Sequence, residues 1–165
     1  MTGKDAIRTA LMGTQQVLNW YISDLSDADL LVRPAPNANH IAWQLGHLIN
    51  SEIGLLGPKN VPGATYPELP AGFADQHGKG TAAAEPPKGF LSKEEYSKLF
   101  NRFRSASLEN LAKLSDSDLD KPITGDMAKF APTLGALFLL ESNHTLMHAG
   151  QFTVVRRKLG RPVLF

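Results

Sequence analysis

Two histidines four residues apart, His144 and His148, stand in the segment "HTLMHAGQ" within a long apolar stretch. Residues with this spacing lie one turn apart on the same face of a helix, so the two imidazoles point the same way. Their ring nitrogens need partners, because a buried polar group without one costs roughly 1 to 3 kcal/mol. The pair therefore predicts either a metal site or a hydrogen-bonded pair of core histidines.

A third histidine can reach the same place. His47 lies in "HIAWQLGHL", one turn after Trp43 and beside Gly46. Three imidazoles from two helices would form the three-ligand arrangement of a catalytic zinc site, whose fourth position is left for water or substrate. Nickel and iron also accept this donor set. The alternative, that each histidine is only hydrogen-bonded in the core, stays open.

The two remaining histidines have simpler interpretations. His40, seven residues before His47, is expected to cap its helix or to support the site from outside the ligand set. His77 lies in a segment rich in proline and glycine, and we expect it to be exposed to solvent. Because the chain has no cysteine, a metal must be held by nitrogen and oxygen, and a thiol nucleophile would have to arrive as a cosubstrate.

Two well-known metal motifs do not fit the chain. The His-Glu-x-x-His motif of metalloproteases needs a glutamate after the first histidine, whereas Thr145 follows His144. A di-iron bundle needs Glu-x-x-His on two helices; Glu141 and His144 supply it once, but Gln44 replaces the second glutamate. Glu141 is expected either to accept a proton from a ligand imidazole or to be a buried acid with an arginine partner.

Four segments with helical periodicity must position these residues. Apolar residues recur at steps of three and four over residues 4–25, 40–56, 92–114 and 133–159. Asn39 is expected as the N-cap of the second helix, and Ser92 with Glu95 forms a predicted capping box for the third. Along the fourth, Leu134, Leu137, Glu141, His144, His148, Gln151 and Val155 form a stripe that should face the core.

The string "LSDADL" at residues 25–30 recurs as "LSDSDL" at residues 114–119. Either a common helix-capping string occurs twice by chance, or two helix-loop-helix units pack around an approximate twofold axis. In both cases we predict an all-α protein, a four-helix bundle with a long Pro/Gly-rich loop over residues 57–91 between its second and third helices.

Composition narrows the class of protein. Seventeen basic and sixteen acidic residues give a net charge of +1, without the concentrated positive charge of nucleic-acid binding proteins. The 165 residues are 42% hydrophobic, enough for a single domain over residues 1–165. Neither an apolar signal segment nor a run of about 18 apolar residues is present. We expect a soluble, cytoplasmic protein that binds a small molecule, and neither nucleic acid nor membrane.

"HIAWQLGHL", followed much later by "NHTLMHAGQFTVVRRKLGRP", resembles the DinB-like (YfiT-like) superfamily of metal-dependent enzymes. The strings "LSDADL", "GFADQHGKGT", "PPKGF" and "SKEEY" extend the resemblance over most of the chain. It implies an up-down-down-up four-helix bundle with a divalent metal on His47, His144 and His148. It also implies a homodimer and, as in some relatives, a small thiol that is activated for transfer or isomerisation.

A divalent ion on three neutral imidazoles lowers the pKa of a bound water or thiol, because its charge is not balanced. The sequence therefore predicts a thiol transferase or a hydrolase. The alternative is a noncatalytic metal-stabilised bundle that acts as a stress-response or interaction module. A fourth protein ligand such as Glu141 would favour that structural role.

Several residues one turn from the predicted ligands are candidates for the pocket, although core packing or solvation explains each as well. They are Trp43, Asn50, Ser51 and Gln151. The loop over residues 57–91 is long enough to close over an open coordination position, and its Phe73, His77 and Phe90 are the residues expected to take part.

Overall fold

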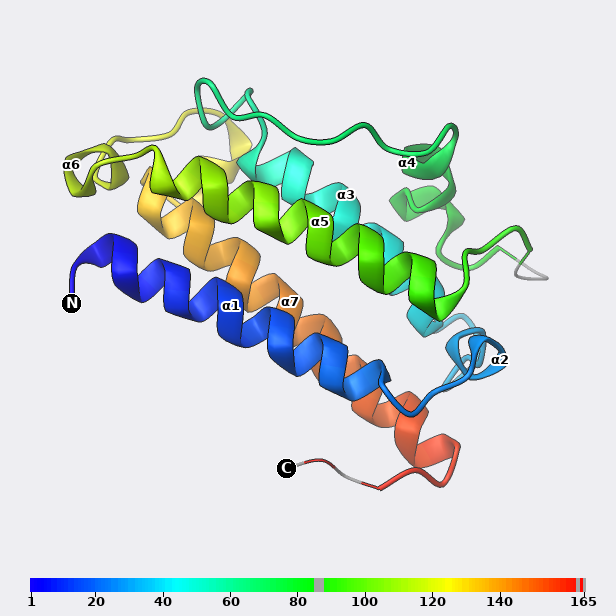
Figure 1. The fold of residues 1–165 in the computed structure, drawn as a ribbon. Helices are drawn as coiled ribbons and strands as arrows, with labels where there is room; N and C mark the ends of the chain where they lie inside the picture. The colour runs from blue at the N-terminus through cyan, green and yellow to red at the C-terminus, as the bar shows by residue number, and fades with distance from the viewer. Residues whose placement is uncertain (85–87, 163, 165) are drawn as a thin grey trace.

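Four long helices dominate the computed structural model, which describes residues 1–84, 88–162 and 164 (Figure 1). They are α1 (Gly3–Ile22), α3 (Ile41–Leu56), α5 (Lys93–Ala112) and α7 (Leu134–Lys158). Shorter elements connect them: α2 (Asp27–Leu30), α4 (Phe73–Gln76), η1 (Lys79–Thr81), α6 (Asp116–Leu119) and η2 (Asp126–Lys129). The described residues form no strand beyond an isolated bridge between Pro122 and Thr133. The predicted all-α class is confirmed.

The long helices lie side by side, and each packs against two of the others. Helix α1 contacts α7 and α5, and α3 contacts α5 and α7. Figure 1 shows α1 and α7 running in one direction and α3 and α5 in the other. None of the helices in the described part of the chain is both long and apolar enough to cross a membrane.

Two hydrophobic clusters fill the interior, and a polar layer separates them. One includes Leu18, Leu45, Phe103 and Phe152, and the other includes Leu11, Leu56, Leu111 and Leu137. Between them every long helix contributes at least one buried polar residue, and Thr14, Glu52, Arg104 and Glu141 are among these. Burying such groups is costly unless they bond one another, so this layer fixes how the four helices align.

Local capping largely sets where the helices begin. Ser92 and Glu95 form the predicted capping box, and Thr133 caps α7. The expected cap at Asn39 is wrong, because His40 occupies that position and its Nδ1 accepts from the backbone N–H of Trp43 at 3.1 Å. The capping role considered for His40 is thereby confirmed. Helix α1 ends at Ile22 and α5 at Ala112, two to three residues earlier than periodicity indicates.

The repeated "LSD" strings begin a short helix in each half of the chain. Ser26 and Ser115 are N-caps of α2 and α6, each within a complete capping box. The contacts of these turns are reciprocal. Lys4 of α1 donates its N–H to Asp116 and its Nζ to the carbonyl of Leu114. Lys93 of α5 donates in the same way to Asp27 and Leu25. Such paired contacts are what an approximate twofold axis requires.

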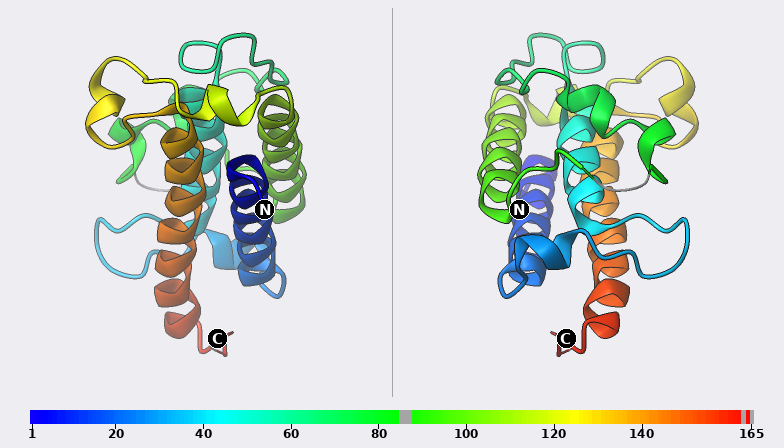
Figure 2. Two further views of the ribbon diagram at one scale, coloured as in Figure 1. Left: turned by 90° about the vertical axis from the view of Figure 1, so that its left-hand side faces the viewer. Right: turned by 90° about the vertical axis from the view of Figure 1, so that its right-hand side faces the viewer.

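The segment over residues 57–91 is a long connection, but it is not without structure. It contains α4 and η1, and its residues 85–87, which include the prolines of "PPKGF", lie outside the described part. His77 is fully buried, so its expected exposure is wrong. Its ring lies against Gly46, where a Cβ atom would come within 2.0 Å of the ring, and its Nε2 and Nδ1 bond Tyr96 and the carbonyl of Phe73. Figure 2 shows this segment beside α3.

Candidate metal centre

Helices α3 and α7 bring three histidines to one point. Each of His47, His144 and His148 offers a ring nitrogen, and the three nitrogens lie within 4.8 Å of one another. Nε2 of His144 and Nε2 of His148 are 3.1 Å apart. Two nitrogens bound at about 2.0 to 2.1 Å to a tetrahedral ion would be roughly 3.3 Å apart. The spacing therefore suits an ion between them as well as a shared proton, and the cluster could bind a metal.

The second nitrogen of His148 has its own partner, which fixes the tautomer. Nδ1 of His148 lies 2.7 Å from Oε1 of Gln44. The amide of Gln44 is oriented by a bond from its Nε2 to the carbonyl of Asn39, so its oxygen faces the imidazole. An amide oxygen can only accept, which assigns the hydrogen to Nδ1 and leaves the lone pair on Nε2. Gln44, which interrupts the di-iron motif, thus orients the ring of His148.

His144 is supported by a two-step relay. Its Nδ1 lies 3.0 Å from Oγ of Ser51, and that hydroxyl bonds Oε2 of Glu141. Glu141 is fully buried, and its other oxygen lies 3.8 Å from Nη2 of Arg104. Glu141 is therefore a buried acid with an arginine partner, and its role as a support for a metal-ligand imidazole stays a prediction. Ser51 carries the connection to His144.

His47 is held by the connection between α3 and α5 and by its own helix. Burial and the charge of Lys79 lower the pKa of His47, and the nearby backbone of His77 opposes this shift. The ring of Trp43 stacks on it at 5.0 Å between centroids and an angle of 7°. All three imidazoles thus have a partner besides the common point, which is the usual environment of a metal-binding histidine.

The histidines resist protonation. Burial lowers the pKa of His144 to about 4, helped by the charges of His47 and Lys79. Burial, with His144 and His47 close by, lowers the pKa of His148 to about 3. Only a neutral imidazole can bind a metal, so the cluster keeps the binding form well into the acidic range. By contrast, burial and the nearby Glu52 raise the pKa of Glu141 well above its usual value.

A buried ion-pair network continues from Glu141 into the polar layer. Arg104 donates from Nε to Glu52 at 2.6 Å and from Nη2 to Thr145 at 2.8 Å. Its Nη1 bonds Thr14 and the carbonyl of Leu11. Ser107 bonds Glu52 and contacts Tyr66 at 2.6 Å. Sequence reasoning missed this network, although an arginine within the apolar pattern of α5 was a signal for it.

The other residues predicted for the pocket differ in their burial and in their contacts. Asn50 donates from Nδ2 to the carbonyl of Ala74, and thereby ties α4 to α3. Gln151 is exposed, so the predicted core-facing stripe is wrong at this position. Phe152, four residues after His148, takes the buried place because the helix carries that side of α7 inward. Phe73 is buried against His77, and Phe90 contacts the rings of His40 and His77.

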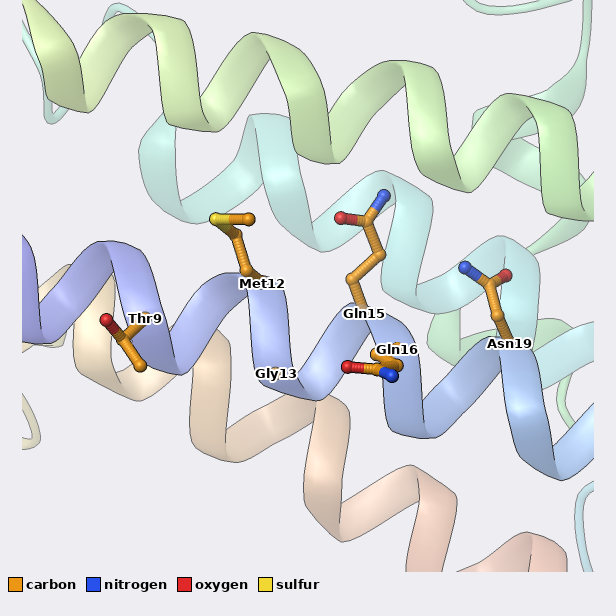
Figure 3. A pocket seen from close by; sticks show the side chains of 6 residues that line it. All are labelled: Thr9, Met12, Gly13, Gln15, Gln16 and Asn19. Carbon is orange, nitrogen blue, oxygen red and sulfur yellow. The ribbon is translucent and has the colours of Figure 1, made fainter.

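A cavity on another face carries no comparable chemistry. It has a volume of about 620 Å³ and lies on α1, lined by Thr9, Met12, Gly13, Gln15, Gln16 and Asn19 (Figure 3). None of these side chains titrates, and Gln15 and Asn19 donate to Asn101 of α5. The histidine cluster is therefore the better candidate for a functional site.

Comparisons with other proteins identify the family. The profile of the DinB superfamily matches residues 10–152, and the chain belongs to this superfamily. A DinB-like protein from Bacillus cereus has a similar structure, with a TM-score of 0.63 and 20% identity over 94% of this chain and 91% of its own. A conserved protein from Enterococcus faecalis aligns with a TM-score of 0.69 and 12% identity, over 98% and 99% of the two chains. No curated protein matches the chain at comparable significance.

Proposed function

We propose that this protein is a mononuclear metalloenzyme that binds a divalent ion through His47, His144 and His148. One observation carries the proposal: each of the three imidazoles turns one nitrogen to a common point while a separate partner engages the ring from another side. Hydrogen-bonded core histidines have no need of such convergence. Zinc suits three neutral nitrogen donors best, and nickel and iron are accepted by the same set.

A further feature supports catalysis over a purely structural role. Within the described residues the cluster contains three histidines and no carboxylate. Glu141, the acid best placed to become a fourth ligand, is engaged by Ser51 instead. A site with three protein ligands leaves a position for an exchangeable molecule, as catalytic zinc sites do.

The reaction class follows from what such a site can do. When bound, the ion would lower the pKa of a small thiol or of water and so supply a nucleophile near neutral pH. Gln44 and the relay of Ser51 and Glu141 hold two of the ligand rings in the tautomer that binds. Trp43 covers the face of His47 and limits access of solvent from that side. We therefore favour transfer of a small thiol to an electrophile, or hydrolysis, on a small-molecule substrate.

The test is metal binding to protein purified without a histidine tag. We expect one ion per chain, and the cobalt-loaded protein should show the visible bands of a tetrahedral nitrogen site that change when a small thiol is added. His47→Ala should abolish binding. His40→Asn is the matched control, because asparagine is also a good N-cap and His40 lies outside the cluster.

The outcomes separate the two functional classes. Loss of metal in His40→Asn as well as in His47→Ala, or wild-type protein that takes up no ion, would contradict the proposal. Cobalt bands that no added ligand changes would favour the noncatalytic metal-stabilised bundle.

Three further expectations belong to the proposal. The up-down-down-up bundle is supported by the helix directions and contacts described above. The homodimer implied by the family resemblance stays a prediction, which light scattering of the purified protein tests. The cytoplasmic location also stays a prediction, and fractionation of cells tests it.

A further inference from the structure

Lys79 adds a positive charge to the histidine cluster from outside the two helices that hold it. It lies in η1, and its side chain is exposed. Among the described residues no carboxylate forms an ion pair with it, including Asp75 one turn before. Lys79 differs from an ordinary exposed lysine because the segment that carries it is docked beside the three imidazoles.

The chain on both sides of Lys79 is bound to α3. Two residues earlier, the ring of His77 fills the space above Gly46, the residue before His47. Two residues later, Thr81 accepts a hydrogen bond from the indole of Trp43 at 3.1 Å, and Trp43 stacks on His47. Lys79 therefore lies between two contacts, one with the residue before His47 and one with the residue whose ring stacks on His47.

Additional contacts keep this segment in place. Asn50 holds the carbonyl of Ala74 at 3.1 Å, and Arg33 donates to the carbonyls of Ala82 at 2.9 Å and Ala84 at 2.8 Å. His77 is also bonded to Tyr96 of α5 at 2.7 Å. These contacts span the segment from α4 to Ala84, so the position of Lys79 does not depend on a loose loop.

The charges around the cluster are unbalanced. The imidazoles are neutral ligands, and the buried acids Glu52 and Glu141 are engaged with Arg104, Ser107 and Ser51. The segment that carries Lys79 is docked on Gly46 and on Trp43, which stacks on His47, so its positive charge lies on the side of the cluster that this segment covers. A dication there would add to this positive charge, and a concentrated field of one sign attracts ligands of the opposite sign.

We propose that Lys79 selects substrates that carry an anionic group, such as a carboxylate, next to the atom that binds the metal. This inference rests on the proposed function and names its substrate class. The carboxylate would lie against the ammonium of Lys79 while the neighbouring thiol or oxygen reaches the metal. A neutral substrate of the same shape would lack that interaction.

The experiment compares mercaptopropionate with its amide, which has the same chain and no charge. Each is titrated into the cobalt-loaded protein, and the change in the visible bands gives the dissociation constant. We expect the wild-type protein to bind the acid roughly fivefold more tightly than the amide, the range of a single exposed ion pair. Lys79→Met should remove this preference, and Lys79→Arg should keep it. The preference should shrink as salt is raised.

Lys59→Met is the matched control, because Lys59 is an exposed lysine beyond the C-terminal end of α3. It should retain the wild-type preference. If wild-type protein binds the two thiols equally, or if Lys79→Met retains the preference, the role of Lys79 is overturned and the metal site stands. If cobalt does not bind, or neither thiol changes its bands, the proposed function itself fails and the inference fails with it.

Discussion

The two helical units of the chain, α1–α2–α3 and α5–α6–α7, share a scaffold and differ in their polar residues. A single sequence spacing relates Ser26 to Ser115 and also Glu52 to Glu141. The same spacing relates Leu25 to Leu114, Asp29 to Asp118, Leu30 to Leu119, Leu45 to Leu134 and Gly46 to Gly135. The shared positions are caps, core residues and one buried acid per unit, which are the residues that build and align helices.

The residues of the candidate site break this correspondence. His47 corresponds to Ala136, and His144 corresponds to Leu55. Arg104, which bonds or faces both buried acids, corresponds to Gln15. The comparison indicates that the scaffold does not depend on the histidines, and that the candidate site lies at positions where the two units differ.

Among the variants that test this difference between the units, Arg104→Met should have the largest effect on the free energy of unfolding. Arg104 corresponds to Gln15 of the first unit, and the change makes both positions uncharged. It also leaves Glu52 and Glu141 buried without their cation. Removing one partner of a buried ion pair typically costs about 3 to 5 kcal/mol. We expect a loss of this size in the free energy of unfolding, measured with urea.

The control is Gln15→Met, which removes a partly buried bond to Asn101. Its expected cost is about 1 kcal/mol, that of an ordinary hydrogen bond. Equal losses in the two variants would show that the buried charge of Arg104 has no special role.

Ser51→Ala tests the relay between His144 and Glu141. Loss of a group that supports a ligand imidazole typically lowers metal affinity by about 10- to 100-fold. We expect a loss in this range from competition with a chelator, and Ser51→Thr should restore most of the affinity because it keeps the hydroxyl. Ser107 is the matched control, since it bonds Glu52 as Ser51 bonds Glu141. Ser107→Ala should leave metal affinity unchanged; a similar loss there would contradict the relay.

The pH dependence of stability should differ when His144 is replaced by leucine, the residue at the corresponding position of the first unit. In the metal-free unfolded chain this imidazole takes up a proton near its ordinary pKa of 6.5, whereas in the folded protein burial delays protonation to about 4. The folded state therefore binds fewer protons in this window, and its stability is lost as the pH falls through it. His144→Leu should lose less stability between pH 7 and pH 5, by urea unfolding with a chelator present. A slope equal to that of wild type would contradict the assignment.

Much of the helical framework could be predicted from the sequence, because periodicity and caps are local. The four long helices, the capping box of Ser92 and Glu95 and the shared direction of His144 and His148 all follow from spacing within a single helix. The ends of the helices could be predicted less accurately, because the last turn of a helix depends on contacts with other segments.

The parts that could not be predicted depend on contacts between distant segments. His77 is buried because α4 docks on α3, and the missing side chain of Gly46 provides the space. The roles of Gln44 and Arg104 depend on which helices face each other, and no periodicity within one helix contains that information. The available signals were a glycine beside a predicted ligand and an arginine, Arg104, within the apolar pattern of α5.

The smallest expected effect tests whether the two units are equivalent in energy as well as in geometry. Ser26 and Ser115 adopt nearly the same backbone angles, −86° and 168° against −87° and 165°, and each forms a capping box with the aspartate three residues later. Replacing an N-cap serine by alanine costs about 1 kcal/mol. We expect Ser26→Ala and Ser115→Ala to lower the free energy of unfolding by equal amounts, and the double variant to lose their sum within roughly 0.5 kcal/mol, because the two caps share no partner. A clear inequality would show that the surroundings of α2 and α6 differ in energy, and the twofold relation would then describe only the backbone.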